Sequence, residues 1–224
     1  MPDAIPPYLF AGGIRLSLNH RVILSDIRLQ CHEHRVTGLL GRNGSGKSCL
    51  FQIIYGLLPA EKSVQLNGHI VYDAYKHPHL VTSLPQFHFI PPSATIRTVF
   101  KNFGLDPAAF TALFPELRAG NNTAIGKLST GERRLVETYV IIKSPSRFSL
   151  LDEPFSGLSP VQVEKLMQLI RTETQNKGFL ITDHHYRQVM AISDDVYVLK
   201  NAKTYFVTAD EDLDLLGYTP GTRT

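Results

Sequence analysis

Apolar residues occupy alternate positions in two early segments of the chain. Ile14, Leu16 and Leu18 are separated by single polar or charged residues, and residues 22–27 form a second segment rich in β-branched residues and leucine. A period of two places the apolar side chains on one face of a β-strand. These segments predict an antiparallel β region near the N-terminus.

Short apolar runs and longer helical patterns then follow one another along the chain. Strands are predicted at residues 36–40, 70–72, 148–151, 178–182, 195–199 and 204–207. Helices are predicted from the end of the glycine-rich turn at 41–46 to about Tyr55, and at residues 95–103, 107–113, 130–142, 160–174 and 186–192. Strands alternating with helices at both ends indicate an α/β fold with a mostly parallel sheet. The helical middle indicates an inserted α-helical subdomain of about 87–146, which leaves a core of about 1–86 and 147–224.

Composition narrows the class of protein. The chain has 224 residues, of which 43% are hydrophobic and 19% charged, so it is long enough for one domain with a well-buried core. The formal charge of +3 is too small to indicate a nucleic-acid partner, and none is expected. Two cysteines, Cys31 and Cys49, exclude a disulfide framework and favour a reducing compartment.

The chain shows no signal for crossing a membrane or for secretion. No apolar run approaches the roughly 20 residues that a bilayer-spanning helix needs. Residues 1–7 lack a basic segment followed by an apolar one, so no secretory signal is expected. We therefore expect a cytoplasmic protein that associates with a membrane only through a partner.

The strongest chemical motif is a complete phosphate-binding loop (P-loop), G-R-N-G-S-G-K-S, at residues 41–48. It lies between a predicted strand and a predicted helix, where its glycines allow backbone N–H groups to surround a phosphate. In this geometry the Lys47 ammonium reaches the β- and γ-phosphates and the Ser48 hydroxyl binds Mg²⁺. The alternative, a glycine turn before a helix, is disfavoured because the full pattern rarely arises by chance. The expected nucleotide-binding residues are Gly41, Asn43, Gly44, Ser45, Gly46, Lys47, Ser48 and Cys49.

Two adjacent carboxylates, Asp152 and Glu153, end the strand predicted at 148–151. This placement is costly unless the charges are used, because burying an unpaired carboxylate is unfavourable. Asp152 suits a contact to Mg²⁺, direct or through water, and Glu153 suits a general base that activates the attacking water. The alternative is a surface strand end that leads into a loop marked by Pro154. The P-loop earlier in the chain makes that alternative the weaker one.

A third motif, L-S-T-G-E at residues 128–132, comes just before a predicted helix. Ser129 and Glu132 have the spacing of a capping box, which explains them structurally. The same capped helix start, with its glycine, also suits a second anion-binding site. The two interpretations are compatible, so the capping pattern decides neither.

The order of these motifs resembles that of the ATP-binding cassette (ABC) ATPases, and the resemblance covers nearly the whole chain. Residues 128–132 resemble the signature LSGGQ, with Thr130 for the first motif glycine and Glu132 for glutamine. Gln86 lies where the family has its Q-loop glutamine, residues 156–159 resemble the D-loop, and His184 resembles the switch histidine. By this resemblance residues 1–224 form a single ABC ATPase domain with a P-loop NTPase fold that binds ATP and Mg²⁺.

The resemblance also implies a dimer and a membrane partner. Two copies, or this chain and a paralogous cassette, would face each other head to tail. Each ATP would contact one chain's P-loop and the signature residues of the other chain, which are Ser129, Thr130, Gly131 and Glu132. Gln86 would sense Mg²⁺ and the attacking water, and His184 would contact the γ-phosphate. A groove beside the helical subdomain would receive a short helix of an integral membrane transporter subunit at the cytoplasmic face of the membrane.

Two departures from the family pattern bear on these expectations. Ser159 replaces the D-loop aspartate, which weakens the expected contact across the dimer. The position at which the family stacks an aromatic ring on adenine falls near Leu18 and Asn19. The candidate substitutes for that ring are Tyr8, Phe10 and His20.

Several neighbours of the motifs are given structural interpretations. Arg133 and Arg134 are expected on the solvated face of the signature helix. The Cys49 thiol is expected to be buried rather than to act as a redox switch. His185 is expected to face away from the nucleotide.

Three classes of function fit an ABC ATPase. The ATPase subunit of a transporter with separate membrane chains is favoured, since the chain is one cassette with no added domain. The alternative is a soluble ABC ATPase acting on ribosomes, DNA or protein complexes. Such proteins usually carry tandem cassettes or a long coiled coil, whereas Lys47 and Ser129 are only 82 positions apart. A non-catalytic nucleotide-binding regulator is disfavoured because Glu153 and His184 are both present.

Overall fold

The computed structural model describes residues 7–117 and 119–217. Residues 1–6, which make up most of the segment inspected for a secretory signal, lie outside these ranges. No helix within them is both long enough and apolar enough to span a bilayer.

Ten strands form one mixed sheet, in the order β5-β4-β1-β2-β10-β9-β3-β8-β7-β6. Five neighbours within it are parallel. They are β9 (Asp195–Lys200), β3 (Val36–Gly41), β8 (Gly178–Thr182), β7 (Phe148–Asp152) and β6 (Val81–Leu84). All residues of β7 and β8 are buried, as expected for parallel strands covered on both faces. The prediction of an α/β fold with a parallel sheet is confirmed.

Antiparallel strands extend the sheet on the other side. They are β1 (Tyr8–Leu18), β2 (Arg21–His32), β4 (Glu61–Leu66) and β5 (His69–Ile70). β10 (Lys203–Phe206) pairs antiparallel with β9 and in parallel with β2, so it joins the two regions. Asn19 and His20, both with positive φ, form the two-residue turn of the β1–β2 hairpin.

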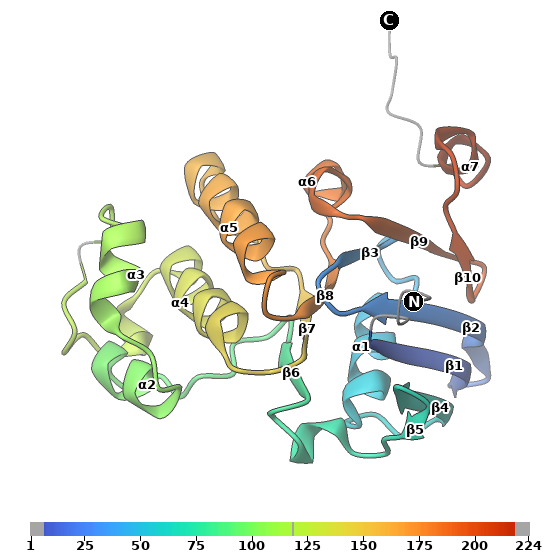
Figure 1. Cartoon of the computed structure of the whole chain (residues 1–224), viewed down its shortest axis with the longest axis horizontal. Coiled ribbons are helices and arrows are strands. Elements are labelled where there is room, and N and C mark those ends of the chain that lie inside the picture. The colour runs from blue at the N-terminus through green and yellow to red at the C-terminus, as the bar shows by residue number, and fades with distance from the viewer. Residues whose placement is uncertain (1–6, 118, 218–224) are drawn as a thin grey trace, which may run out of the picture.

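Helices cover the two faces of the sheet. α1 (Lys47–Tyr55) packs its apolar side into a core shared with β1, β2 and β4. α4 (Thr130–Lys143), α5 (Pro160–Glu173) and α6 (Tyr186–Ile192) contribute to a second core on the opposite face. In Figure 1, α1 lies beside the N-terminal strands, whereas α4 and α5 lie together on the other side of β7.

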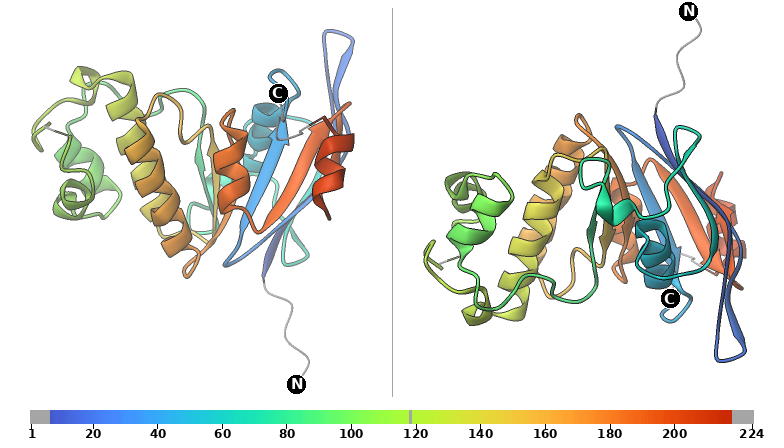
Figure 2. Two further views of the ribbon diagram at one scale, coloured as in Figure 1. Left: turned by 90° about the horizontal axis from the view of Figure 1, so that it is seen from above. Right: turned by 90° about the horizontal axis from the view of Figure 1, so that it is seen from below.

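Two short helices, α2 (Ile96–Asn102) and α3 (Pro107–Leu113), lie at the end of the molecule farthest from the β1–β2 hairpin (Figure 2). Aromatic rings join them to α4. The ring centroids of Phe100 and Tyr139 are 5.7 Å apart, and those of Phe110 and Tyr139 are 4.9 Å apart. The remaining short elements are η1 (Ala74–Lys76), η2 (Ile125–Lys127) and α7 (Asp210–Leu215).

One predicted strand needs correction. The strand expected at 70–72 is only His69–Ile70, paired with β4, and Val71 and Tyr72 lie beyond it. β4 and β6 were not predicted at all. β4 has only two buried apolar residues, Val64 and Leu66, so its alternation is short.

Candidate active site

The P-loop connects β3 to α1. β3 lies between β8 and β9 and delivers residues 41–48 to the edge where the parallel strands end. Gly46 precedes α1 with a φ of 106°, and a Cβ there would come within 2.9 Å of the Ile23 side chain. Only glycine satisfies both constraints. The N-terminus of α1 therefore opens onto the loop, an arrangement that favours a bound anion.

Lys47 is the first residue of α1, and its amino group lies over the loop. Nζ donates hydrogen bonds to the backbone carbonyls of Gly41, at 2.6 Å, and Arg42, at 3.2 Å. Burial lowers the pKa of Lys47, and nearby carboxylates, Asp152 foremost, oppose that shift. The loop thus holds a partly buried cation at the point where a phosphate chain would lie.

Asp152 is the last residue of β7 and is buried. Burial raises the pKa of Asp152 to about 6, and a hydrogen bond from the Ser48 hydroxyl opposes this rise. The two side chains bring a carboxylate and a hydroxyl together beside the P-loop. Hard oxygen ligands of this kind suit Mg²⁺, so the residues fit a magnesium ion.

Glu153 follows β7 with a φ of 53°, a left-handed conformation that costs a non-glycine residue about 1–2 kcal/mol. Hydrogen bonds hold it on both sides. Its N–H donates to the Thr182 carbonyl at 2.7 Å, and its own carbonyl accepts from Arg134 Nε at 3.1 Å. Backbone strain that neighbours over-determine is common at functional sites. Here the constrained backbone fixes the position of Glu153 directly after the end of β7.

Arg134 is not solvated, so that prediction was wrong. The residue is 3% exposed, and its guanidinium donates to the backbone carbonyls of Pro85, Asp152 and Glu153. The planar fork of five donors suits such a cluster of acceptors, which compensates the buried charge. Arg133 is also largely buried, with Nε 3.2 Å from Glu137. Arg134 therefore joins α4, the segment before Gln86 and the end of β7.

His184 lies beside Glu153. Its Nδ1 is 4.0 Å from the Glu153 carboxylate and 3.2 Å from that of Asp183. Asp183 is buried, and its other carboxylate oxygen accepts the Phe155 N–H at 2.9 Å. His185 Nδ1 also lies 2.9 Å from Asp183. The buried Asp183 thus orients both histidines.

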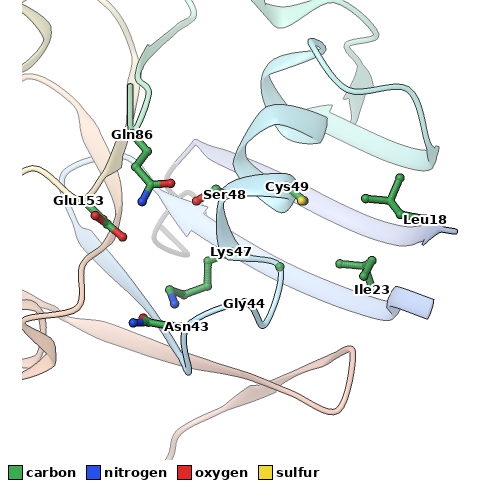
Figure 3. Close-up of a pocket in the computed structure, with 10 residues that line it drawn as sticks. Leu18, Ile23, Asn43, Gly44, Lys47, Ser48, Cys49, Gln86 and Glu153 are labelled. Carbon is green, nitrogen blue, oxygen red and sulfur yellow. The ribbon is translucent and has the colours of Figure 1, made fainter. Parts of the chain in front are cut away.

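Figure 3 shows the cavity that these elements enclose, with a volume of about 430 Å³. Residues from the P-loop, the segment after β6 and the end of β7 meet at one side of it. Predicted site residues that line it are Asn43, Gly44, Gly46, Lys47, Ser48, Cys49, Gln86 and Glu153. Predicted site residues outside its lining are Gly41, Ser45, Asp152, His184, Ser129, Thr130, Gly131 and Glu132.

The signature residues form the N-terminus of α4. Ser129 and Glu132 make the predicted capping box: the Glu132 N–H donates to Ser129 Oγ at 3.3 Å, and the Ser129 N–H donates to the Glu132 carboxylate at 2.8 Å. A Cβ at Gly131 would lie 2.3 Å from the Gly157 carbonyl oxygen. The signature and D-loop backbones of this chain are therefore in direct contact.

Ser159, which departs from the D-loop pattern, has a structural task. It caps α5: the Gln162 N–H donates to Ser159 Oγ at 3.4 Å, and the Ser159 N–H donates to Gln162 Oε1 at 3.0 Å. Pro160 follows as the first residue of the helix. Serine in place of the family's aspartate at position 159 therefore still caps the start of α5.

Sequence reasoning anticipated the apolar end of the cavity in part: the family resemblance placed the base near Leu18, whereas Ile23 was missed. Leu18 and Ile23 line it, whereas Tyr8, Phe10 and His20, the expected substitutes for the aromatic ring, do not. The Cys49 thiol is partly buried rather than buried, and it faces the cavity. Ile23 adjoins the P-loop across the β1–β2 hairpin, a contact that no local pattern reveals.

A P-loop between a central parallel strand and a helix, with a second parallel strand of the same sheet that ends in a carboxylate, defines the class of P-loop nucleoside triphosphatases. Comparison with known proteins makes the class narrower. The family described as ABC transporter matches residues 24–156. The chain belongs to this family.

Individual relatives agree with the family. A probable ABC transporter ATP-binding protein of Azorhizobium caulinodans is 33% identical in an alignment 209 positions long, which covers 85% of this chain and 73% of the relative. The lipopolysaccharide export system ATP-binding protein LptB of Acidithiobacillus ferridurans is 29% identical in an alignment 229 positions long, which covers 92% of this chain and 91% of the relative.

Solved structures share the fold. The structure of an ATP-binding subunit of an ABC transporter matches with a TM-score of 0.77 at 20% identity over 95% of both chains. A nucleotide-free ATP-binding cassette from an ABC transporter matches with a TM-score of 0.75 at 20% identity over 96% of both chains. Fold and family together identify a nucleotide-binding ATPase subunit that powers transport. They support the transporter class over the soluble ATPase.

Proposed function

We propose that this chain hydrolyses MgATP with Glu153 as general base. The observation that carries the proposal is one cavity in which Lys47 and Ser48 of the P-loop face Gln86 and Glu153 from two neighbouring strand ends. Glu153 would take a proton from water as its oxygen attacks the γ-phosphorus, and ADP would leave with the bridging oxygen. The acceleration would come mainly from holding the water, Glu153 and the γ-phosphate in the geometry that the reaction requires.

The other residues bind and orient. The P-loop amides and the Lys47 ammonium would hold the β- and γ-phosphates, and His184 would contact the γ-phosphate from beside Glu153. Mg²⁺, held by Ser48, Asp152 and Gln86, would neutralise phosphate charge. Asp183 would keep His184 in place.

We further propose a head-to-tail pair, made of two copies or of this chain and a paralogue. The signature residues 129–132 lie outside this chain's own cavity, and their exposed, capped helix start suits the phosphates of a nucleotide held by another chain. In this arrangement residues 1–86 and 147–224 act as the catalytic core and residues 87–146 as a helical subdomain that moves with the bound ATP.

A second cavity supports a membrane subunit as the partner. It has a volume of about 290 Å³ and lies between α1, β6, α2 and α4. Phe87, next to Gln86, and Leu57, after α1, line it while remaining 60% and 54% exposed. An apolar groove with exposed rims suits an inserted helix. We propose that an integral membrane subunit docks here and holds the chain at the cytoplasmic face; the charge of +3 gives no reason to propose a nucleic acid.

Lys47→Ala tests the nucleotide site. We expect ATP affinity to fall at least tenfold, because the variant loses the cation that the loop holds over the phosphates. Calorimetric titration with MgATP measures this, with the exposed Lys101→Ala as the matched control. Unchanged ATP affinity in Lys47→Ala would count against the proposed site.

A further inference from the structure

The end of the active-site cavity away from Glu153 is formed by the β1–β2 hairpin. Leu18, the last residue of β1, and Ile23, in β2, line the same cavity as Lys47 and Ser48. Figure 3 shows their side chains on the far side of the cavity from Gln86 and Glu153, with Cys49 between the two ends. The cavity therefore has a polar end and an aliphatic end.

The direction of a bound nucleotide follows from these two ends. A triphosphate that contacts Lys47 and the N-terminus of α1 places its γ-phosphate toward Gln86 and Glu153. Its base then extends toward the hairpin. Ile23 adjoins the loop closely, since a Cβ on Gly46 would lie 2.9 Å from Ile23 Cγ2. Leu18 is 44% exposed, so it presents an open apolar surface at this end.

The hairpin end lacks groups that tell one base from another. Among the described residues that line the cavity, the polar side chains of Asn43, Lys47, Ser48, Gln86 and Glu153 come from the P-loop and the strand ends. The side chains of Leu18 and Ile23 have neither a hydrogen-bonding atom nor an aromatic ring. Tyr8, at the other end of β1, instead lies against His32, with ring centroids 6.2 Å apart.

We propose that this site accepts purine nucleoside triphosphates as a class, with little discrimination between adenine and guanine. Adenine and guanine differ in the donors and acceptors on their edges but present similar apolar faces. A site rejects an analogue strongly only where its own polar groups would be left unpaired, and an aliphatic surface has none. The inference rests on the proposed nucleotide site and specifies its substrate class.

Titration of the full chain with MgATP and MgGTP tests the inference. Dissociation constants within about threefold of each other are expected. An ATP affinity more than tenfold above that for GTP would overturn the proposal while leaving the nucleotide site in place. Failure of both nucleotides to bind would instead contradict the nucleotide site itself, and the inference with it.

Leu18→Tyr tests whether Leu18 faces the base. An aromatic ring at this position is expected to raise the affinity for ATP and GTP alike, by about tenfold. Stacking uses the face of the base, so it does not depend on the hydrogen-bonding groups along the base's edge. Val22→Tyr is the matched control. Val22 is exposed on the same hairpin but lines a different hollow, so no change is expected. Equal, unchanged affinities in both variants would overturn the assignment of Leu18.

Discussion

Arg134 links three parts of the candidate active site through one side chain. Its guanidinium donates to the carbonyl of Pro85 at 2.7 Å and to those of Asp152 and Glu153. It therefore helps to hold Glu153 in its left-handed conformation. Because α4 also begins with the signature residues, a movement of that helix would reach the proposed general base directly.

Arg134→Lys is expected to reduce kcat at least about tenfold while ATP affinity stays within about threefold. A single ammonium cannot replace the fork that binds three carbonyls, and each buried carbonyl left without a donor costs about 1–3 kcal/mol. Steady-state ATPase kinetics separate kcat from KM. The control is Arg171→Lys, at an exposed ion pair with Asp194. Equal losses of affinity and kcat would show that Arg134 supports the fold rather than the position of Glu153.

Residues within a local motif could be predicted, whereas those defined by distant contacts could not. The P-loop is one contiguous motif, and Asp152 and Glu153 are another. Each could therefore be proposed from the local sequence. Arg134 is charged and follows another arginine in the sequence, so the local pattern predicts an exposed side chain. Its burial depends on carbonyls 18 to 49 positions away. Ile23 likewise adjoins the P-loop only because the β1–β2 hairpin folds over it.

At the scale of elements, the contact between α4 and the D-loop restricts two segments at once. The Cα of Gly131 lies so close to Gly157 that a Cβ would be 2.3 Å from its carbonyl oxygen. Gly157 itself has a φ of 72°, a left-handed conformation. The start of α4 and the turn before α5 are therefore packed directly against each other, and we expect a movement of one to displace the other.

Gly131→Ala is expected to lower ATPase activity at least tenfold with the fold retained. The added methyl group must displace the D-loop backbone, which follows Glu153 by four residues. ATPase assays and circular dichroism measure the two effects. Gly120→Ala is the control, because a Cβ at Gly120 meets no atom within 4 Å. Wild-type activity in Gly131→Ala would show that this contact has no part in catalysis.

Most elements could be predicted because their own residues define them. α3, β8 and α6 have the bounds that apolar spacing and helix-start signals gave. β4 lacked such a pattern, and the strand predicted at 70–72 was displaced from β5, although Asn67-Gly68 between the two strands is a hairpin signal that would have placed both. β6 is a four-residue edge strand that is defined by its pairing with β7. Four residues are too few to show a clear pattern in the sequence.

At the scale of the whole molecule, the groove lined by Phe87 and Leu57 sits next to Gln86. A helix bound in this groove would contact the segment that leads into the active site. The same segment is tied to α4 through the Pro85 carbonyl and Arg134. This arrangement supports coupling between docking and hydrolysis.

Serine substitutions at Leu57 and Phe87 are expected to reduce the amount of membrane subunit that co-purifies with tagged protein from detergent-solubilised cells. Each removes an apolar side chain worth about 1.5–3 kcal/mol when buried, which corresponds to about tenfold or more in affinity. Leu215→Ser, at an 80% exposed leucine in α7, is the matched control. Undiminished recovery of a membrane subunit would place its docking elsewhere, and recovery of ribosomal or DNA-bound partners would favour the soluble class.

The most direct test of the account is light scattering of Glu153→Gln with MgATP, combined with its ATPase rate. Loss of the general base should slow turnover at least about 100-fold, and the unhydrolysed ATP should hold two chains together. The mass is then expected to double from 25.1 kDa with MgATP but not with MgADP. Glu164→Gln, on the exposed side of α5, should behave as the wild type. A Glu153→Gln chain that remains a monomer and hydrolyses ATP at the wild-type rate would contradict the account.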